Sequence, residues 1–271
     1  MRLSYEDLIS PHDIPITLSI GHVKNPSLRE IWKNGVNRFR MYQLYIRLTP
    51  RDYYTQLNAN EGSSYWENLT EEQQNDITMY DIIIQNDSVA LAYEELFNFF
   101  FVERVIYIDK VFVIIKTDDY TTKKEELEVT DDNFSGIIHP INFDSIIDVL
   151  RQVCCMSSDD ILEEKNPSFK NQRAKEIYEK LLKAKKEGML VSKSSSENYT
   201  LANLISSTAA KSTNLNIVDI WDSTLFQLYD QFNKTQNNDI YYINSVRVAV
   251  WGDEKNKFDS TLWYKNNYNT K

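Results

Sequence analysis

Residues 86–115 read NDSVALAYEELFNFFFVERVIYIDKVFVII, and the hydrophobic period changes in the middle of this stretch. Asn86–Ser88 can cap a helix, and apolar residues then recur with the spacing of a helical face as far as Phe101. Two short runs of mostly β-branched and aromatic residues follow, separated by Asp109-Lys110. A two-residue separation is typical of a β-hairpin, although Asp-Lys is not the preferred turn pair. The stretch therefore predicts a helix followed by a pair of antiparallel strands.

Helical signals also precede this stretch. Ser27 and Glu30 have the spacing of a capping box, and a tyrosine-rich helix is expected after Gly35. The alternating residues 14–20 predict a short edge strand, since prolines lie in and around them. Residues 58–64 are polar and predict a loop.

The C-terminal half is helical by the same criteria. Residues 142–155 form an amphipathic pattern, and residues 167–187 have the strongest helix propensity in the chain. Further helical patterns occur at residues 201–210, 217–221, 224–233 and 240–250. We therefore predict an α+β fold, mainly helical, with a small antiparallel sheet within residues 102–141 and a helical C-terminal module.

Charge is spread unevenly along the chain and suggests three parts. Residues 1–165 hold 15 Lys and Arg against 29 Asp and Glu, residues 166–193 hold 8 against 3, and residues 194–271 hold 7 against 8. We predict an acidic α+β module at 1–165, a basic helix and tether at 166–193, and the helical module at 194–271. The net charge of -10 makes nucleic acid an unfavourable partner.

The composition indicates a globular chain in a reducing compartment. Hydrophobic residues make up 42% of the 271, which is enough to bury a sizeable core. No apolar stretch is long enough to span a membrane, and the first residues lack the apolar core of a signal peptide. Cys154 and Cys155 are neighbours and cannot build a disulfide framework. We expect a cytoplasmic protein.

Few residues are available for chemistry. His12, His22 and His139 fall on separate segments without metal-ligand spacing, and every glycine is isolated, so no phosphate-binding loop exists. The pairs of neighbouring aspartates are interpreted as solvated loop residues. We expect no catalytic residue, no metal, no cofactor and no enzymatic activity. A pocket that gathered His22 or His139 with carboxylates would favour an enzyme instead.

Aromatic residues are in surplus, with 17 Tyr, 12 Phe and 5 Trp. Most are expected in an ordinary core, and a minority could line a groove that grips a helix of another protein, because aromatic residues dominate binding hot spots. The candidates for this second role are Tyr42, Tyr45, Phe99, Trp221, Tyr229, Phe232, Trp251 and Trp263.

Several passages, in their order along the chain, resemble passages in a known group of proteins. They are LSYEDLIS, NPSLREI, LTEEQQNDITMYDIII and LFNFFFVERVIY in the first half, then LANLISSTAAKSTNLNIVDIWDSTLFQLYDQF and VAVWGDEKNKFDSTLWYKN. The most specific part runs from Asn216–Trp221 to Trp251–Phe258. Together they resemble tail assembly chaperones encoded by long-tailed phages and prophages of Gram-positive bacteria, over nearly the full chain.

This resemblance implies a function and a set of partners. Such a chaperone would coat the long helical tape-measure protein, keep it soluble and recruit tail-tube subunits, with no catalytic residue. The alternative is a structural virion component, such as a tail completion or connector protein. Assembly into a homo-oligomer stays open at this point.

Overall fold

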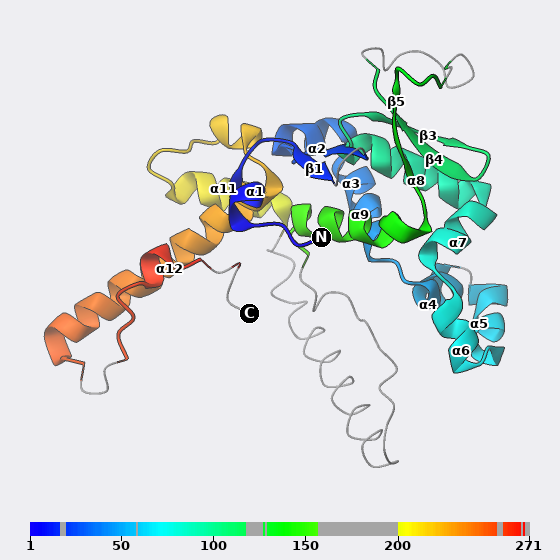
Figure 1. The fold of residues 1–271 in the computed structure, drawn as a ribbon. Coiled ribbons are helices and arrows are strands. Elements are labelled where there is room, and N and C mark those ends of the chain that lie inside the picture. Colours follow the sequence, from blue (N-terminus) through cyan, green and yellow to red (C-terminus); the bar gives the residue numbers. More distant parts are fainter. Residues whose placement is uncertain are drawn as a thin grey trace. The chain divides into compact units, whose positions relative to one another are not determined.

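The computed structural model describes residues 1–16, 20–57, 59–117, 127, 129–156, 200–253, 257–266 and 268. These residues group into two compact units (Figure 1). The first contains the described residues up to Met156 together with Asp222–Phe226, and the second contains those from Thr200 to Trp221 and from Gln227 onward. The predicted α+β class is confirmed, because helices accompany small antiparallel sheets.

The first unit holds most of the regular structure. Its helices are α1 (Tyr5–Ile9), α2 (Leu28–Asn34), α3 (Val36–Arg47), α4 (Pro50–Asp52), a π-helical turn (Tyr53–Leu57), α5 (Ala59–Asn68), α6 (Glu71–Asp76), α7 (Met79–Gln85), α8 (Asp87–Phe100) and α9 (Pro140–Val153). Its strands are β1 (Ile14–Ile16), β2 (Gly21–Val23), β3 (Arg104–Ile108), β4 (Val111–Ile115) and β5 (Phe134–Ile138).

The helix-to-hairpin prediction for residues 86–115 is confirmed. Asn86 caps α8 by accepting from the backbone N–H groups of Ser88 and Val89. Strands β3 and β4 pair antiparallel, and β5 adds to β4 to complete a three-stranded sheet in the order β3-β4-β5. Helix α8 lies against β3 (Figure 1). Its apolar face and the sheet therefore bury each other.

A cluster of phenylalanines forms the centre of this unit. Phe97, Phe100, Phe101 and Phe112 are each fully buried, and the ring of Phe97 meets that of Phe112 edge to face with centroids 5.3 Å apart. The ring of Phe143 in α9 also contacts Phe97. Burying such rings removes much apolar surface from water and so contributes strongly to the stability of this unit.

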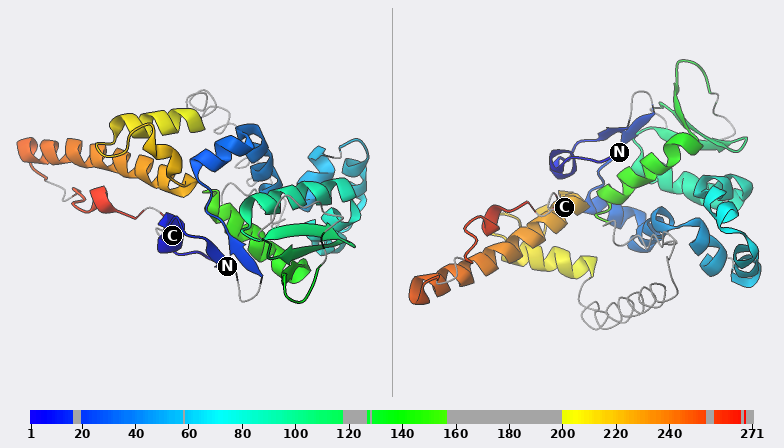
Figure 2. Two further views of the ribbon diagram at one scale, coloured as in Figure 1. Left: turned by 90° about the horizontal axis from the view of Figure 1, so that it is seen from above. Right: turned by 60° about the horizontal axis from the view of Figure 1, so that its bottom comes forward.

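The second unit is helical among the residues described. It contains α11 (Leu201–Lys211), a 3-10 turn (Asp219–Asp222), the long helix α12 (Leu225–Trp251), whose first two residues belong to the first unit, and a 3-10 turn at Leu262–Tyr264. Both views in Figure 2 place α11 beside α12. The ammonium of Lys211 pairs there with the carboxylate of Asp239. The chain beyond α12 returns along it, because the ring of Phe258 contacts Tyr241 at 5.5 Å.

Two predictions about elements are wrong. Residues 58–64 were expected to form a loop, but α5 begins at Ala59. Tyr54 stacks on Trp66 with centroids 5.7 Å apart, so ring packing compensates for the low helix propensity of the polar residues. Residues 224–233 and 240–250 were expected to form separate helices, but α12 is continuous. The polar residues between them contain no proline or glycine, so nothing ends the helix there.

Three other predictions concern residues 217–221, the basic segment and membrane spans. Residues 217–221 were expected to be helical, and the structure gives only the 3-10 turn at Asp219–Asp222. The predicted basic helix at 167–187 and its tether lie outside the described residues, so the predicted module boundaries stay a prediction. Within the described residues, no helix is both long and apolar enough to cross a membrane.

Candidate functional site

Helices α3 and α8 position three of the eight predicted aromatic residues. On α3, Phe39, Tyr42 and Ile46 are buried, and their spacing of three and four residues places them on one face of the helix. Tyr45 lies at the edge of that face and is half-buried. On α8, Tyr93, Leu96 and Phe100 are buried, and Phe99 beside them is half-buried. The sequence periodicity thus turns both sets of rings inward.

The rings of the two helices are in contact. Phe99 lies 5.4 Å from Tyr42 and 5.9 Å from Phe39 between ring centroids. One turn further on, Tyr45 and Tyr93 are 5.6 Å apart, and the hydroxyl of Tyr93 donates a hydrogen bond of 2.8 Å to the carbonyl oxygen of Tyr45. The structure therefore brings Tyr42, Tyr45 and Phe99 together, as a site that holds a partner would require.

An open groove runs over these rings, and we call it the α3–α8 groove. It consists of two adjoining hollows of about 340 and 590 Å³. The two hollows share Arg38, Tyr42 and Glu95 as lining residues. The remaining lining residues are Asn34, Asn37, Met41, Tyr45, Leu91, Ala92, Glu94, Asn98 and Phe99. Together the hollows are large enough for several side chains of a partner.

Apolar side chains remain exposed along the groove. Met41 is 45% exposed on α3 and Leu91 is 52% exposed on α8, and both line it. Leu44 on α3 is exposed as well, at 42%. Long apolar side chains that stay in water beside a floor of aromatic rings are typical of a surface that binds another protein.

Charged groups border the same hollows. Arg38 and Glu95 both lie close enough to Tyr42 to influence its pKa in opposite directions. Burial raises the pKa of the Tyr42 phenol above its ordinary value, and this is the largest effect on that group. The phenol is therefore neutral at physiological pH, and it lies in a lining that combines aromatic rings with Asn, Arg and Glu side chains. The carboxylates outnumber the guanidinium, because Glu94 and Glu95 face one Arg38.

The other five predicted aromatic residues belong to the second unit. Trp221, Tyr229 and Phe232 are half-buried. Trp251 is 74% exposed at the end of α12, and Trp263 is 51% exposed and stacks edge to face on Tyr264. The second half of α12 carries further exposed apolar residues, namely Ile240, Tyr242, Ile243, Val246 and Val250.

The sequence did not single out Arg38, Met41, Leu91 and Glu95 as site residues. The available signal was an apolar residue on the outer side of an amphipathic helix, which Met41 and Leu91 both are. This signal is weak, because single exposed apolar residues are common on protein surfaces. Only their position beside the rings of a second helix makes them candidate site residues, and that position depends on the tertiary fold.

One histidine lies beside a carboxylate. The imidazole Nδ1 of His22 lies 2.8 Å from Oε1 of Glu103, and the backbone N–H of His22 donates to Oε2 of the same side chain at 2.8 Å. Glu103 is buried, and this contact joins β2 to the chain after α8. His139 instead caps α9, where its Nδ1 accepts from the N–H of Ile141. Within the described ranges, no three or more His, Cys, Asp or Glu side chains group as metal ligands would.

Comparison with known proteins gives one match. Residues 191–268 match the family model described as the YomV second domain, where YomV is a protein of a phage region in Bacillus. The match covers the described residues of the second unit and the Asp222–Phe226 segment. No curated protein and no solved structure matched the chain. The matched part therefore indicates a phage-related protein.

Proposed function

We propose that this protein is a phage tail assembly chaperone that binds the tape-measure protein and keeps it soluble while the tail is built. The α3–α8 groove carries the proposal, because it joins an aromatic floor to exposed Met41 and Leu91. The phage-related family match at residues 191–268 supports it independently. We propose further that the protein acts by binding alone and is not an enzyme.

The groove suits an amphipathic helix, the form that a tape-measure protein would present. Such a helix inserts side chains at positions i, i+3 or i+4 and i+7, and two adjoining hollows over Tyr42 would receive successive turns. Glu94 and Glu95 at the border favour a helix with Lys or Arg beside its apolar stripe. The net charge of -10 would keep the complex soluble after apolar surface is covered.

The affinity of each contact should be modest, since tube subunits must later displace the chaperone. An open groove meets this requirement, because only part of a bound helix is removed from water. Several copies bound along one long client would then hold it through many weak contacts.

The test is co-expression with a helical tape-measure fragment of the same phage, with the soluble fraction of the fragment as the measurement. Met41→Asp and Leu91→Asp place a charge in the groove while leaving the buried rings unchanged, so each should reduce binding about tenfold or more. Ile141→Asp is the matched control, because Ile141 is 89% exposed on α9 and does not line the groove.

The outcomes separate the proposal from its alternatives. The chaperone function is supported if the wild type and Ile141→Asp keep the fragment soluble and both groove variants fail to do so. Equal behaviour of all four proteins contradicts the groove as the client site. Mass spectrometry of mature particles addresses the structural virion component, because stoichiometric presence of this protein in the tail would contradict a chaperone that leaves before completion.

A further inference from the structure

The five residues Asp222–Phe226 belong to the first unit, although the residues on both sides of them belong to the second. We call them the clasp segment. Thr224, Leu225 and Phe226 are 2%, 3% and 7% exposed, so the second half of the segment is as buried as core residues are, whereas Asp222 is exposed. It lies between a 3-10 turn that ends at Asp222 and helix α12, which begins at Leu225.

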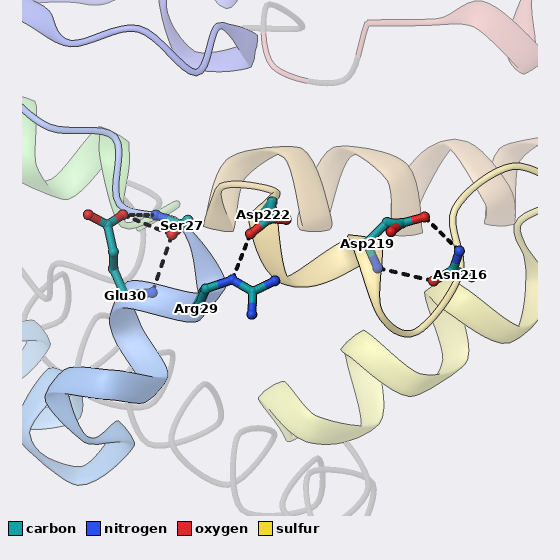
Figure 3. Close-up of polar contacts among 6 residues, drawn as sticks. All are labelled: Ser27, Arg29, Glu30, Asn216, Asp219 and Asp222. Carbon is teal, nitrogen blue, oxygen red and sulfur yellow. Dashed lines mark hydrogen bonds and ion pairs between the residues drawn. The ribbon is translucent and has the colours of Figure 1, made fainter.

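The clasp segment contacts the start of α2. The backbone N–H of Leu28 donates to the carbonyl oxygen of Ser223 at 2.9 Å, and Ser27 faces Thr224 in an isolated antiparallel bridge. Next to this bridge, Nε of Arg29 lies 2.7 Å from Oδ1 of Asp222 (Figure 3). The segment is thus held by one backbone hydrogen bond, one isolated bridge and an ion pair at its first residue.

An apolar contact completes the binding. The ring of Phe226 meets the ring of Tyr5 in α1 edge to face, with centroids 6.0 Å apart. The receiving surface therefore consists of α1 and the first residues of α2, and it ends in an aromatic ring. Its recognition pattern is an acidic residue followed four positions later by a phenylalanine.

The receiving surface is held in shape by contacts of its own. Ser27 accepts from the N–H of Glu30, and the Glu30 carboxylate accepts from the N–H of Ser27, which fixes the N-terminus of α2 (Figure 3). Leu28 is buried. The capping contacts between Ser27 and Glu30 lie within the first turn of α2 and do not involve the clasp segment, so this helix end is preorganised for the segment that docks on it.

We propose that this surface is an exchangeable docking site, and that the clasp segment of a second copy of this chain can occupy it. An identical segment makes identical contacts, so the choice between the two sources depends on the connecting chain and on concentration. Only five residues have to leave the first unit, because the chain on both sides already belongs to the second. Reciprocal exchange between two copies gives a closed dimer with both sites filled.

The exchange can be trapped with cysteines placed at the bridge. Residues that face each other across an antiparallel pair have Cα atoms about 4.5–5.5 Å apart, within the range of a disulfide. One full-length variant carries Ser27→Cys and another carries Thr224→Cys. The native thiols do not interfere, because Cys154 is buried and burial raises the pKa of both Cys154 and Cys155.

The two single variants are mixed at high concentration and oxidised, because a tethered segment competes at an effective concentration on the order of mM. We expect a disulfide-linked dimer of twice 31.9 kDa from the mixture and little from either variant alone. The double variant Ser27→Cys/Thr224→Cys should form an internal disulfide at low concentration. An internal disulfide without any mixed dimer would overturn the exchange, and a double variant that forms none would overturn the contact itself.

Charge reversal gives a second, independent test. The Arg29→Asp variant has carboxylates at both positions 29 and 222, and the Asp222→Arg variant has guanidinium groups at both. Like charges therefore meet in each variant, whether the segment comes from the same chain or from an identical copy. Mixing the two variants restores opposite charges at both sites only in a reciprocally exchanged heterodimer. We expect native mass spectrometry of differently tagged chains to show the heterodimer at least threefold more abundant than the homodimers. The double variant Arg29→Asp/Asp222→Arg should behave like the wild type. A statistical mixture would contradict the proposal. The proposal does not depend on a tape-measure client, so it can fail or succeed separately from the chaperone function.

Discussion

Gly21 and Glu103 form a close contact at the scale of single residues. Gly21 has φ of +138°, and a Cβ built there would lie 2.8 Å from Oε2 of Glu103, the oxygen that accepts from the N–H of His22. We predict that Gly21→Ala destabilises the first unit by about 2–3 kcal/mol, from backbone strain plus displacement of a buried carboxylate. Urea unfolding measures the change.

Gly35 offers the matched control for this prediction. Its φ of +100° is also strained for alanine, but no atom lies within 4 Å of the added Cβ. Gly35→Ala should therefore report backbone strain alone and cost less than Gly21→Ala. Equal costs for the two variants would mean that the Glu103 contact contributes nothing to stability.

The pairing of Asp222 with Arg29 makes the clasp segment sensitive to acid. The Arg29 guanidinium holds the pKa of the Asp222 carboxyl below its ordinary value of 3.8. Because the pKa is lowered, the ion pair stabilises docking fully when the pH is above the ordinary pKa of the carboxyl. This stabilisation is lost as the pH falls through the lower pKa that the carboxyl has in the docked state. Protection of the Leu28 N–H against hydrogen exchange should therefore be constant near neutral pH and decrease only in acid.

Asp222→Asn is the control for this pH dependence. Its amide does not titrate, so the difference in protection between wild type and variant should shrink as the pH falls below about 4. A difference that stays constant through this range would show that the ion pair does not contribute to docking.

Single residues show why the candidate site was only partly predictable. Tyr42, Tyr45 and Phe99 were identified because an excess of rings on short helices is visible in the sequence. Met41 and Leu91 were not, since each becomes part of a site only where two helices pack together. The pairing of His22 with Glu103 spans 81 positions and has no sequence motif.

The hairpin of β3 and β4 has turn residues that are poorly suited to the conformation they adopt. Asp109 and Lys110 have φ of 47° and 64°, so both lie in the left-handed region that a type I′ turn requires. Asn-Gly is the preferred pair for this turn. We predict that Asp109→Asn/Lys110→Gly stabilises the first unit by up to about 1 kcal/mol, measured by thermal unfolding. Lys110→Ala, which keeps the strain, should give no such gain.

Elements were predictable wherever their own residues determine them. The hairpin follows from two apolar runs separated by two residues, and the start of α2 follows from Ser27 and Glu30. Helix α5 was missed, because its polar residues predict a loop and only the packing of Tyr54 against Trp66 explains the helix. The sequence predicts two helices where α12 is continuous, because the residues in its middle are polar and interrupt the apolar pattern.

The clasp segment shows what no local pattern could predict about the whole molecule. Residues 222–226 lie inside the stretch matched by the family model of the C-terminal part, yet they complete the first unit. The ion pair that holds them joins residues 193 positions apart. Composition and periodicity give the class of each part of the chain, but not which short segment leaves one unit to join the other.

Two compact units predict two unfolding transitions. The first unit has a large aromatic core that includes Phe97, and the described part of the second has a smaller one that includes Leu204 and Ile205. Phe97→Ala should destabilise by about 3–5 kcal/mol and Leu204→Ala by about 2–5 kcal/mol, each through a cavity in its own core. Calorimetry should therefore show each variant lowering a different transition and leaving the other near its wild-type temperature. A single transition that moves in both variants would mean that the continuous helix α12 and the clasp segment couple the units into one cooperative whole.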